Sequence, residues 1–494
     1  MREATTTASG TGLHRSLSTG RIVYLVVAAA APLAGVVGTV PLAFAIGNGA
    51  GVPGAFALAG LILLCFSVGY AAMSRRIVST GGFYTYMSYG LGRPPAVAGG
   101  LVAVVAYNTA TIGLAGALGY FAQIVAKAHG IDLPWEAWGA IGIALVGFMG
   151  YHQIDMSARL LSVVMICEVA ILTALSVSIV VHDGGSALPA TSFSPHTVLG
   201  SQLGVTLMFA FVSFIGVESA ANYGEETPNP RRSVPIATYL SVALIAVFYT
   251  VMSWTAVGAL GADKLRAVAN KELGDLFFGL SDNYLNGTAT TIMQVLMCTS
   301  LFGATLGLHN AANRYMYALG RESVLPGWVG GVHSRHGAPH AAALLQTGIT
   351  AVVVAAFALA GLHPYVNLAT SMLGIGTLGI VILQASAVLS ALGYFRNDPE
   401  RHWWRTMLAP LLGLAGLVAA VVLIVTNFPL VTGSKSVVVN SLPWLYVVAA
   451  VGGLAYAWWM RSARPERYAG LATPAAPTEP EAAMRAESLP LQAG

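Results

Sequence analysis

Twelve long, mostly uncharged stretches dominate the chain, and they constrain its fold more than any other feature. Each has about 20 residues or more, the length that an α-helix needs to cross a bilayer. Of the 494 residues, 56% are hydrophobic and only 9% are charged, whereas soluble domains carry about 25% charged residues. The sequence therefore predicts an all-α polytopic membrane protein with twelve transmembrane helices. The stretches are 22–48, 53–74, 95–126, 134–152, 157–181, 199–223, 234–258, 288–318, 340–361, 365–391, 407–427 and 440–460.

The distribution of basic residues predicts the orientation of the chain. An even number of spans places both ends on one side, and cytoplasmic loops carry an excess of Lys and Arg. Most of the 24 basic residues fall on the side of the N-terminus. We therefore expect a plasma (inner) membrane protein with both termini in the cytoplasm. The basic residues on the other side are Lys127, Lys264, Arg266, Lys271 and Lys435.

Three segments lie outside the predicted spans and are polar or mixed in composition. Residues 1–20 read as a cytoplasmic N-terminal tail. Residues 462–494 are rich in Ala, Pro and Glu, which is typical of a disordered cytoplasmic tail. The loop 261–286 mixes charged residues with paired Leu and Phe, and it predicts short helices on the outer surface.

Several classes of protein are excluded by what the sequence contains. The net charge of +4 is small and spread over the membrane surfaces, which does not suggest nucleic-acid binding. The histidines and cysteines lack metal-ligand spacing, so we expect no metal and no cofactor. No G-x-x-x-x-G-K-[ST] motif for direct ATP use occurs. Because we find no nucleophile–base pair at membrane depth either, we do not expect an enzyme.

Two spans carry residues that interrupt helices. The run from Pro32 to Pro41 combines two prolines with Gly35 and Gly38, and the run from Phe211 to Ser219 holds Gly216 beside Glu218. Proline lacks an amide donor, and glycine tolerates the dihedral angles of unwound backbone. Small residues in membrane helices also serve close packing. Corresponding breaks in two halves of a chain favour a binding site in an inverted-repeat transporter.

Four motifs resemble those of the amino acid–polyamine–organocation superfamily of transporters. The most specific is the pair FAFVSFIGVE at 209–218 and EETPNPRRSVP at 225–235; GGFYTY at 81–86 and NRYMYALGRE at 313–322 are similar to two further signatures. The resemblance implies the leucine-transporter fold. Residues 21–391 would then form the transport core, with inverted five-helix repeats at 21–181 and 199–391, and residues 407–460 would form helices 11 and 12.

The resemblance also implies a substrate site between the two breaks. Half-helix N-termini suit a carboxylate, and carbonyls at C-terminal ends suit an ammonium. The family's G-[ST]-G is here Gly38-Thr39-Val40 followed by Pro41, a departure that leaves room for a decarboxylated or otherwise altered substrate. The expected substrate-binding residues are Gly35, Val37, Gly38 and Thr39 in the first break, Tyr107 and Asn108 in span 3, and Phe211, Val212, Ser213, Gly216 and Glu218 in the second.

Acidic residues supply the remaining candidates. Glu168 lies inside span 5, where the family can carry a lysine that acts as a cation, and we expect it to carry the coupling proton; the alternative is a structural Glu paired with span 1 or span 8. Glu218 is either a gating or amine contact or a cap for unwound backbone. The expected inner gate pairs Glu225 and Glu226 with Arg231 and Arg314.

The sequence as a whole predicts secondary active transport of an amino acid or a related small amine. Protons or a counter-substrate would drive the transport. The predicted partners of the protein are therefore its small-molecule substrate, the driving solute and the lipid bilayer. A polyamine or monoamine permease is the alternative in the same class. A solute sensor that does not transport is the alternative in another class.

Overall fold

The computed structural model describes residues 17–77, 81–152, 158–332, 339–399, 402–433 and 436–471. Within these ranges the regular structure consists of α-, 3₁₀- and π-helices, without a strand. A helix pairs its backbone groups within its own segment, as the hydrocarbon of a bilayer requires. The prediction of an all-α membrane protein is confirmed.

Ten helices in the described ranges are long and apolar enough to cross a membrane. Several contain a break or begin with a turn of another helix type. They are α1 with α2 (Thr19–Ala29 and Pro32–Ile46), α3 (Val52–Arg76), α5 (Arg93–Ala128), α7 (Ala158–Asp183), α9 with η4 (Leu203–Ser213 and Val217–Glu226), α10 (Pro230–Leu260), α13 (Gly287–Arg321), α14 (His340–Leu359), η7 with α15 (Pro364–Ala369 and Thr370–Tyr394), and η8 with α16 (Trp403–Leu408 and Ala409–Thr426).

Two further helices, α6 (Trp135–His152) and α19 (Trp444–Ala463), cover the remaining predicted spans. They have 18 and 20 residues. Each of the twelve predicted spans therefore contains a helix, and ten of the twelve also meet the criterion of length and hydropathy. The structure is consistent with twelve transmembrane helices, and the count itself stays a prediction.

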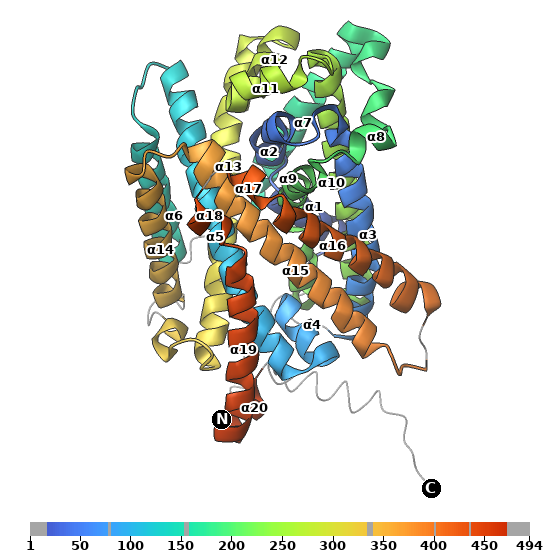
Figure 1. Cartoon of the computed structure of the whole chain (residues 1–494), viewed down its shortest axis with the longest axis vertical. Coiled ribbons are helices and arrows are strands. Elements are labelled where there is room, and N and C mark those ends of the chain that lie inside the picture. Colours follow the sequence, from blue (N-terminus) through green and yellow to red (C-terminus); the bar gives the residue numbers. More distant parts are fainter. Residues whose placement is uncertain are drawn as a thin grey trace, which may run out of the picture.

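Short helices cover the two ends of the bundle. In the loop 261–286 they are α11 (Leu265–Glu272), η5 (Leu273–Asp275) and α12 (Leu276–Tyr284), as the sequence predicted. Figure 1 shows α11 and α12 at one end, and α4 and α20 toward the other. The remaining short helices are η1 (Gly49–Gly51), α4 (Gly82–Leu91), η2 (Gly184–Ala187), η3 (Ala190–Phe193), α8 (Pro195–Val198), η6 (Gly327–Gly330), α17 (Phe428–Thr432), α18 (Val437–Asn440) and α20 (Pro465–Gly470).

The two broken helices lie at the centre of the bundle (Figure 1). In the most apolar part of each, 83% of the residues are buried for Leu203–Ala221 and 67% for Thr19–Ile46, against 28% for α14. Helix α14 therefore lies at the outside of the bundle, where much of its surface is exposed. Polar groups on α1, α2 and α9 are shielded from lipid by the surrounding helices.

Small residues allow the helices to approach closely. A methyl group added at Gly376 of α15 would come within 2.7 Å of the Ala110 side chain on α5. Because lipid tails are as apolar as the side chains, such close packing replaces the hydrophobic effect as a source of helix association. These contacts help to fix the helices that surround the two breaks.

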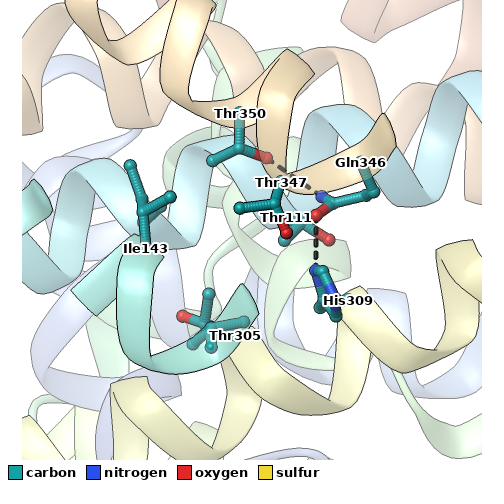
Figure 2. Close-up of a pocket in the computed structure, with 9 residues that line it drawn as sticks. Thr111, Ile143, Thr305, His309, Gln346, Thr347 and Thr350 are labelled. Atoms are coloured by element: carbon teal, nitrogen blue, oxygen red, sulfur yellow. Dashed lines mark hydrogen bonds between the residues drawn. The ribbon is translucent and has the colours of Figure 1, made fainter. Parts of the chain in front are cut away.

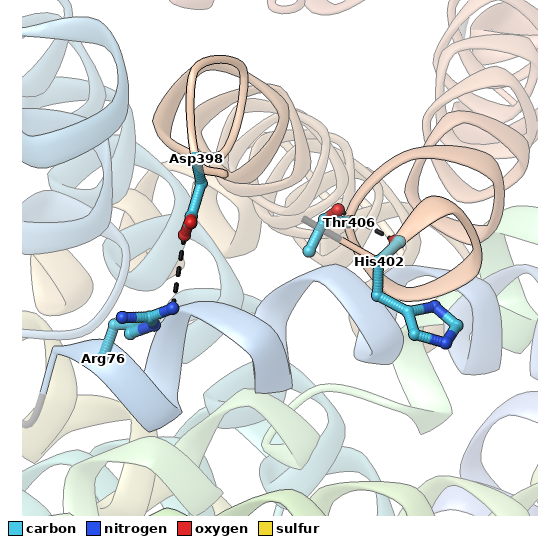
Figure 3. A network of polar contacts seen from close by, with 4 residues as sticks. All are labelled: Arg76, Asp398, His402 and Thr406. Atoms are coloured by element: carbon cyan, nitrogen blue, oxygen red, sulfur yellow. Dashed lines mark hydrogen bonds and ion pairs between the residues drawn. The ribbon is translucent and has the colours of Figure 1, made fainter. Parts of the chain in front are cut away.

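One ion pair ties the end of α3 to the segment that follows α15 (Figure 3). The Arg76 guanidinium lies 3.3 Å from the Asp398 carboxylate. In the same view, the Thr406 hydroxyl donates to the His402 carbonyl at the start of η8. Because the Arg76 side chain is 46% exposed, we expect the pair to contribute less than about 1 kcal/mol.

Candidate functional site

The first helix break lies directly before Pro32 and not within the run that follows it. Helix α1 ends at Ala29, α2 begins at Pro32, and Ala31 adopts a left-handed conformation with φ of 46°. Proline disfavours the α conformation in the residue before it. The predicted position at Gly38-Thr39-Val40 is therefore wrong, because these residues lie inside α2.

Glycines in α2 serve close contacts. A Cβ at Gly35 would collide with the Tyr249 ring, and the Tyr249 hydroxyl donates to the Ala30 carbonyl at 3.1 Å. Gly38 makes its contact through the backbone. Its carbonyl accepts a hydrogen bond from the Tyr365 hydroxyl at 3.1 Å. Val37 is fully buried. The glycines thus hold α2 against α10 and η7.

The N-terminus of α2 is bound by a buried carboxylate and a hydroxyl. The Leu33 amide donates to Glu168 Oε2 at 3.1 Å, and the Ala34 amide donates to Ser300 Oγ at 3.3 Å. Glu168 is only 2% exposed. A negative group is favoured here because a helix N-terminus presents free amides and a partial positive charge. Glu168 of α7 and Ser300 of α13 therefore join three helices at the first break.

The second break lies at Gly216, where the sequence predicted it. Helix α9 ends at Ser213, η4 begins at Val217, and Gly216 has φ of 110°. L-residues with a side chain rarely adopt that angle, so the glycine is required there. Gly216 also approaches the first break, because a Cβ on it would come 3.3–3.4 Å from Ala29.

Glu218 folds back over the second break. Its Oε2 accepts from the Gly216 amide, and its Oε1 accepts from the Tyr107 hydroxyl, both at 3.0 Å. The Tyr70 hydroxyl donates to the Glu218 carbonyl at 3.1 Å. Glu218 is 7% exposed. The cap that the sequence offered as one role for Glu218 is present, and the carboxylate also faces the aromatic residues of α5.

A hydroxyl pair joins α2 to α9. Thr39 Oγ1 and Ser213 Oγ lie 3.0 Å apart, and the Thr39 hydroxyl donates to the Gly35 carbonyl at 2.5 Å. Both residues were predicted at the site, and both are buried. Phe211 is buried and Val212 half-buried on the same helix. The structure thus brings the predicted residues of α2 and α9 together.

The two predicted residues of α5 point to different partners. Tyr107 reaches Glu218 and stacks on Tyr315, with ring centroids 5.2 Å apart. The Asn108 side chain instead donates to the Val104 carbonyl at 2.7 Å and lies 3.8 Å from the Met316 sulfur on α13. Asn108 therefore has the contacts of a helix–helix packing residue.

The structure does not join the described members of the predicted inner gate. Arg231 and Arg314 are exposed, and the Glu225 side chain lies outside the described part of the structure. The Glu226 carbonyl accepts from the Leu17 amide at 3.0 Å. Among the described side chains, Glu226 pairs with neither arginine. The gate stays a prediction.

Ser300, Tyr70 and Tyr249 contact the breaks, and two more tyrosines contact predicted site residues. Tyr315 stacks on Tyr107, and Tyr365 donates to the Gly38 carbonyl. Sequence reasoning missed all five. The tyrosines are widely separated in the sequence, where aromatic residues in membrane helices read as packing by default. Ser300 lies in an otherwise ordinary apolar stretch. A buried tyrosine needs a partner for its hydroxyl, which is the one signal that could have marked them.

A small polar cavity lies apart from the breaks, between α5, α6, α13 and α14 (Figure 2). His309 Nδ1 is hydrogen-bonded to the Gln346 amide oxygen, and Gln346 donates to the Thr350 hydroxyl at 3.0 Å. Thr111 and Thr305 also line the space. The described residues contain no cluster of three metal-ligating side chains. This histidine is held by an amide, and its surroundings are not those of a metal ligand.

A comparison with known families decides the identity of the chain. The profile described as amino acid permease matches residues 17–454. The chain belongs to the amino acid permease family. The permease is similar to an uncharacterised transporter of Mycobacterium tuberculosis, with 26% identity over 383 residues, or 76% of this chain and 79% of the other.

Two relatives of the permease in Bacillus subtilis have descriptive names. One is a branched-chain amino acid permease, 25% identical over 368 residues that cover 70% of this chain and 74% of the relative. The other is an aspartate–proton symporter, 23% identical over 314 residues that cover 61% and 60%. This permease is therefore a multi-pass membrane transporter.

The fold is also found among solved structures. The crystal structure of MhsT in complex with L-phenylalanine superimposes on the permease with a TM-score of 0.57 and 16% sequence identity. The match covers 85% of the permease and 100% of the MhsT chain. The permease therefore has the leucine-transporter fold that its sequence motifs implied.

Proposed function

We propose that the permease is a secondary active transporter of an amino acid or a related small amine, working by alternating access. It would act in the plasma membrane with both ends in the cytoplasm. The observation that carries this proposal is the meeting of two helix breaks at the centre of the bundle, each bound by a buried carboxylate. Such half-helix ends are where transporters of this architecture hold substrates and ions.

Glu218 is the candidate partner for the substrate's ammonium group. Its carboxylate accepts hydrogen bonds from Gly216, from Tyr107 and from its own backbone amide, whereas a carboxylate has about four lone-pair sites. Oxygen capacity for an ammonium therefore remains. Tyr107, Thr39 and Ser213 would border the substrate, and Gly35, Val37, Gly38, Phe211, Val212 and Gly216 would shape the space by packing.

Glu168 is the candidate proton carrier. A charged carboxylate within a membrane is costly, and uptake of a proton removes that cost. The protonated acid keeps an oxygen that can accept from the Leu33 amide, so its contact with α2 survives in both states. Protonation would therefore change the charge beside the first break while the contact with α2 is kept.

The named relatives fit the same class of transport. One relative carries the name of a proton symporter and another that of an amino acid permease. Exchange against a counter-substrate is the alternative to proton coupling. The contacts proposed for the inner gate, Glu225 and Glu226 with Arg231 and Arg314, would form in another state of the transport cycle.

Uptake into proteoliposomes tests the proposal. Radiolabelled amino acids and amines are presented with and without an inward proton gradient, to the unmodified permease and to Glu168→Gln. We expect gradient-driven accumulation that the variant loses. The matched control is Glu136→Gln, which removes an exposed carboxylate at the start of α6 and should leave uptake unchanged.

The other results have defined meanings. Exchange that is indifferent to pH and to Glu168→Gln would make the permease an antiporter and leave Glu168 a structural residue. Saturable binding without uptake or counterflow would make it a solute sensor. Absence of both binding and transport across the whole panel would overturn the proposed function.

A further inference from the structure

The backbone amides of the first break are all occupied by the chain itself. Pro32 has no N–H, the Leu33 amide donates to Glu168, and the Ala34 amide donates to Ser300. The amides of Ala30, Ala31 and Gly35 donate to carbonyls of the chain at 2.9–3.2 Å. No amide from Ala30 to Gly35 is left for a substrate carboxylate, although such amides are what make a helix N-terminus an anion site.

Five backbone amides at the second break also donate to groups of the chain itself. The Gly216 amide donates to the Glu218 carboxylate. The amides of Phe214, Ile215, Val217 and Ser219 donate to carbonyls of the chain at 3.0–3.2 Å. An anion that approached this break would meet a carboxylate.

The carbonyls of the first break, in contrast, have lost donors. In a continuous helix the amides of Ala31 and Leu33 would bind the carbonyls of Val27 and Ala29. Here the Ala31 amide donates to Ala28 and the Leu33 amide to Glu168. The end of α1 therefore offers acceptor oxygens, and its dipole favours a positive group.

The buried charges within the described part of the molecule have one sign. Its buried charged side chains are Glu168 and Glu218, and no Lys or Arg is buried there. A desolvated substrate carboxylate would thus meet neither a cationic side chain nor a free amide of the first break. An unpaired charge in such a place is strongly unfavourable.

We infer that the permease recognises a cationic amine that bears no free carboxylate. The inference rests on the proposed function and narrows it: Glu218 binds the ammonium, while Glu168 and Ser300 take the place that a substrate carboxylate would fill. A primary monoamine, or an amino acid whose carboxyl group is masked, has the required charge. An ordinary zwitterionic amino acid has to displace Glu168 or Ser300 from α2.

Matched ligands that differ in one group test the inference. The series for each side chain contains the amino acid, the amine that lacks its carboxylate, the amino acid amide and the N-acetyl amino acid. Side chains of alanine, leucine and phenylalanine are used. Binding to the purified full-length permease in detergent is followed by thermal shift, because neutral amines cross protein-free membranes by themselves.

We expect the amine and the amide to bind on the order of a hundredfold more tightly than the amino acid, and the N-acetyl compound not to bind. Tightest binding by the free amino acid would overturn the inference and leave the proposed function standing. No binding by any member, together with no uptake in the wider panel, would overturn both.

A pair of serine variants keeps the test independent of the ligand chosen. Ser300→Ala removes the acceptor of the Ala34 amide and frees one N–H for a carboxylate. We expect the preference for amine over amino acid to fall about tenfold. The control, Ser67→Ala, removes a buried hydroxyl that donates only to the Leu63 carbonyl of its own helix, and the preference should not change. An unchanged preference in Ser300→Ala would contradict the inference.

Discussion

The two helix breaks are built with different backbone chemistry, although a buried carboxylate binds an amide at each. In the first, a proline follows an alanine that is held in the left-handed region, and the carboxylate that binds the freed amide comes from another helix, α7. In the second, a glycine takes the unusual angle, and the carboxylate comes from the residue two positions later. The first break is thus held by tertiary structure, whereas the second is largely encoded locally.

This difference has a consequence for motion. The Leu33–Glu168 contact joins α2 to α7, so a change of charge at Glu168 acts at the junction of two helices. The Gly216–Glu218 contact stays within one segment and holds its shape. We therefore propose that coupling acts at the first break and substrate recognition at the second.

The largest expected effect follows from Gly216→Ala. The variant places a side chain at φ of 110° and a Cβ 3.3–3.4 Å from Ala29, and strained backbone of this kind costs about 1–3 kcal/mol. We expect lost transport and a lower melting temperature in detergent. Gly261→Ala is the control, because Gly261 also has positive φ, 76°, but has open space around it. Equal behaviour of the two variants would show that contact with the first break is unimportant.

The second largest effect is expected from Glu218→Gln. The variant keeps an oxygen for the Gly216 amide but removes the charge, and a hydrogen bond to a charged group contributes about 1.5–3 kcal/mol. We expect apparent substrate affinity to fall between about tenfold and 150-fold, with folding retained. Equilibrium binding measures the substrate affinity, and size-exclusion chromatography checks that the variant is folded. Unchanged affinity would make Glu218 a backbone cap only.

A third, smaller effect is expected from Tyr107→Phe. The variant deletes the hydrogen bond to Glu218 Oε1 and keeps the ring that stacks on Tyr315. The Glu218 charge and its contact with the Gly216 amide remain, and only the position of the carboxylate is less fixed. We expect that loss to cost about 1 kcal/mol, so substrate affinity should fall about fivefold. Tyr70→Phe provides the comparison, because that hydroxyl reaches only the Glu218 carbonyl. An equal loss in both variants would show that the carboxylate is not the affected group.

The same difference explains which parts of the site could be predicted from sequence. Gly216 and Glu218 lie two residues apart, so a short stretch of sequence was enough to predict the second break. The first break was predicted too far along the chain, because Gly35 and Gly38 resemble break residues but lie inside α2. There Gly35 leaves room for the Tyr249 ring, and the Gly38 carbonyl accepts from Tyr365. Only tertiary structure shows that Pro32 with Ala31 forms the interruption.

Long-range contacts were the part that sequence could not supply. Length and apolar composition were enough to predict helices at all twelve positions, since the bilayer leaves few alternatives. Glu168 was recognised because a lone acid in an apolar span is unusual. Its partners Leu33 and Ser300 lie on spans 1 and 8, the two spans offered for a structural role of Glu168. No local pattern shows which residues on those spans it meets, because they lie more than 100 residues away in sequence.

The smallest expected effect comes from Ala31→Gly, which makes the first break resemble the second. The left-handed conformation of Ala31 costs roughly 1–2 kcal/mol, and glycine removes that cost while losing about 0.5–1 kcal/mol through the greater freedom of the unfolded chain. The net change should be a stabilisation of at most about 1.5 kcal/mol, measured as a small rise in melting temperature in detergent. Transport should persist, because the contacts of Leu33 and Ala34 are made by backbone amides that the substitution leaves in place. A marked loss of stability would instead mean that the Ala31 methyl group packs at the break, and that the first break depends on its side chains as strictly as the second depends on its glycine.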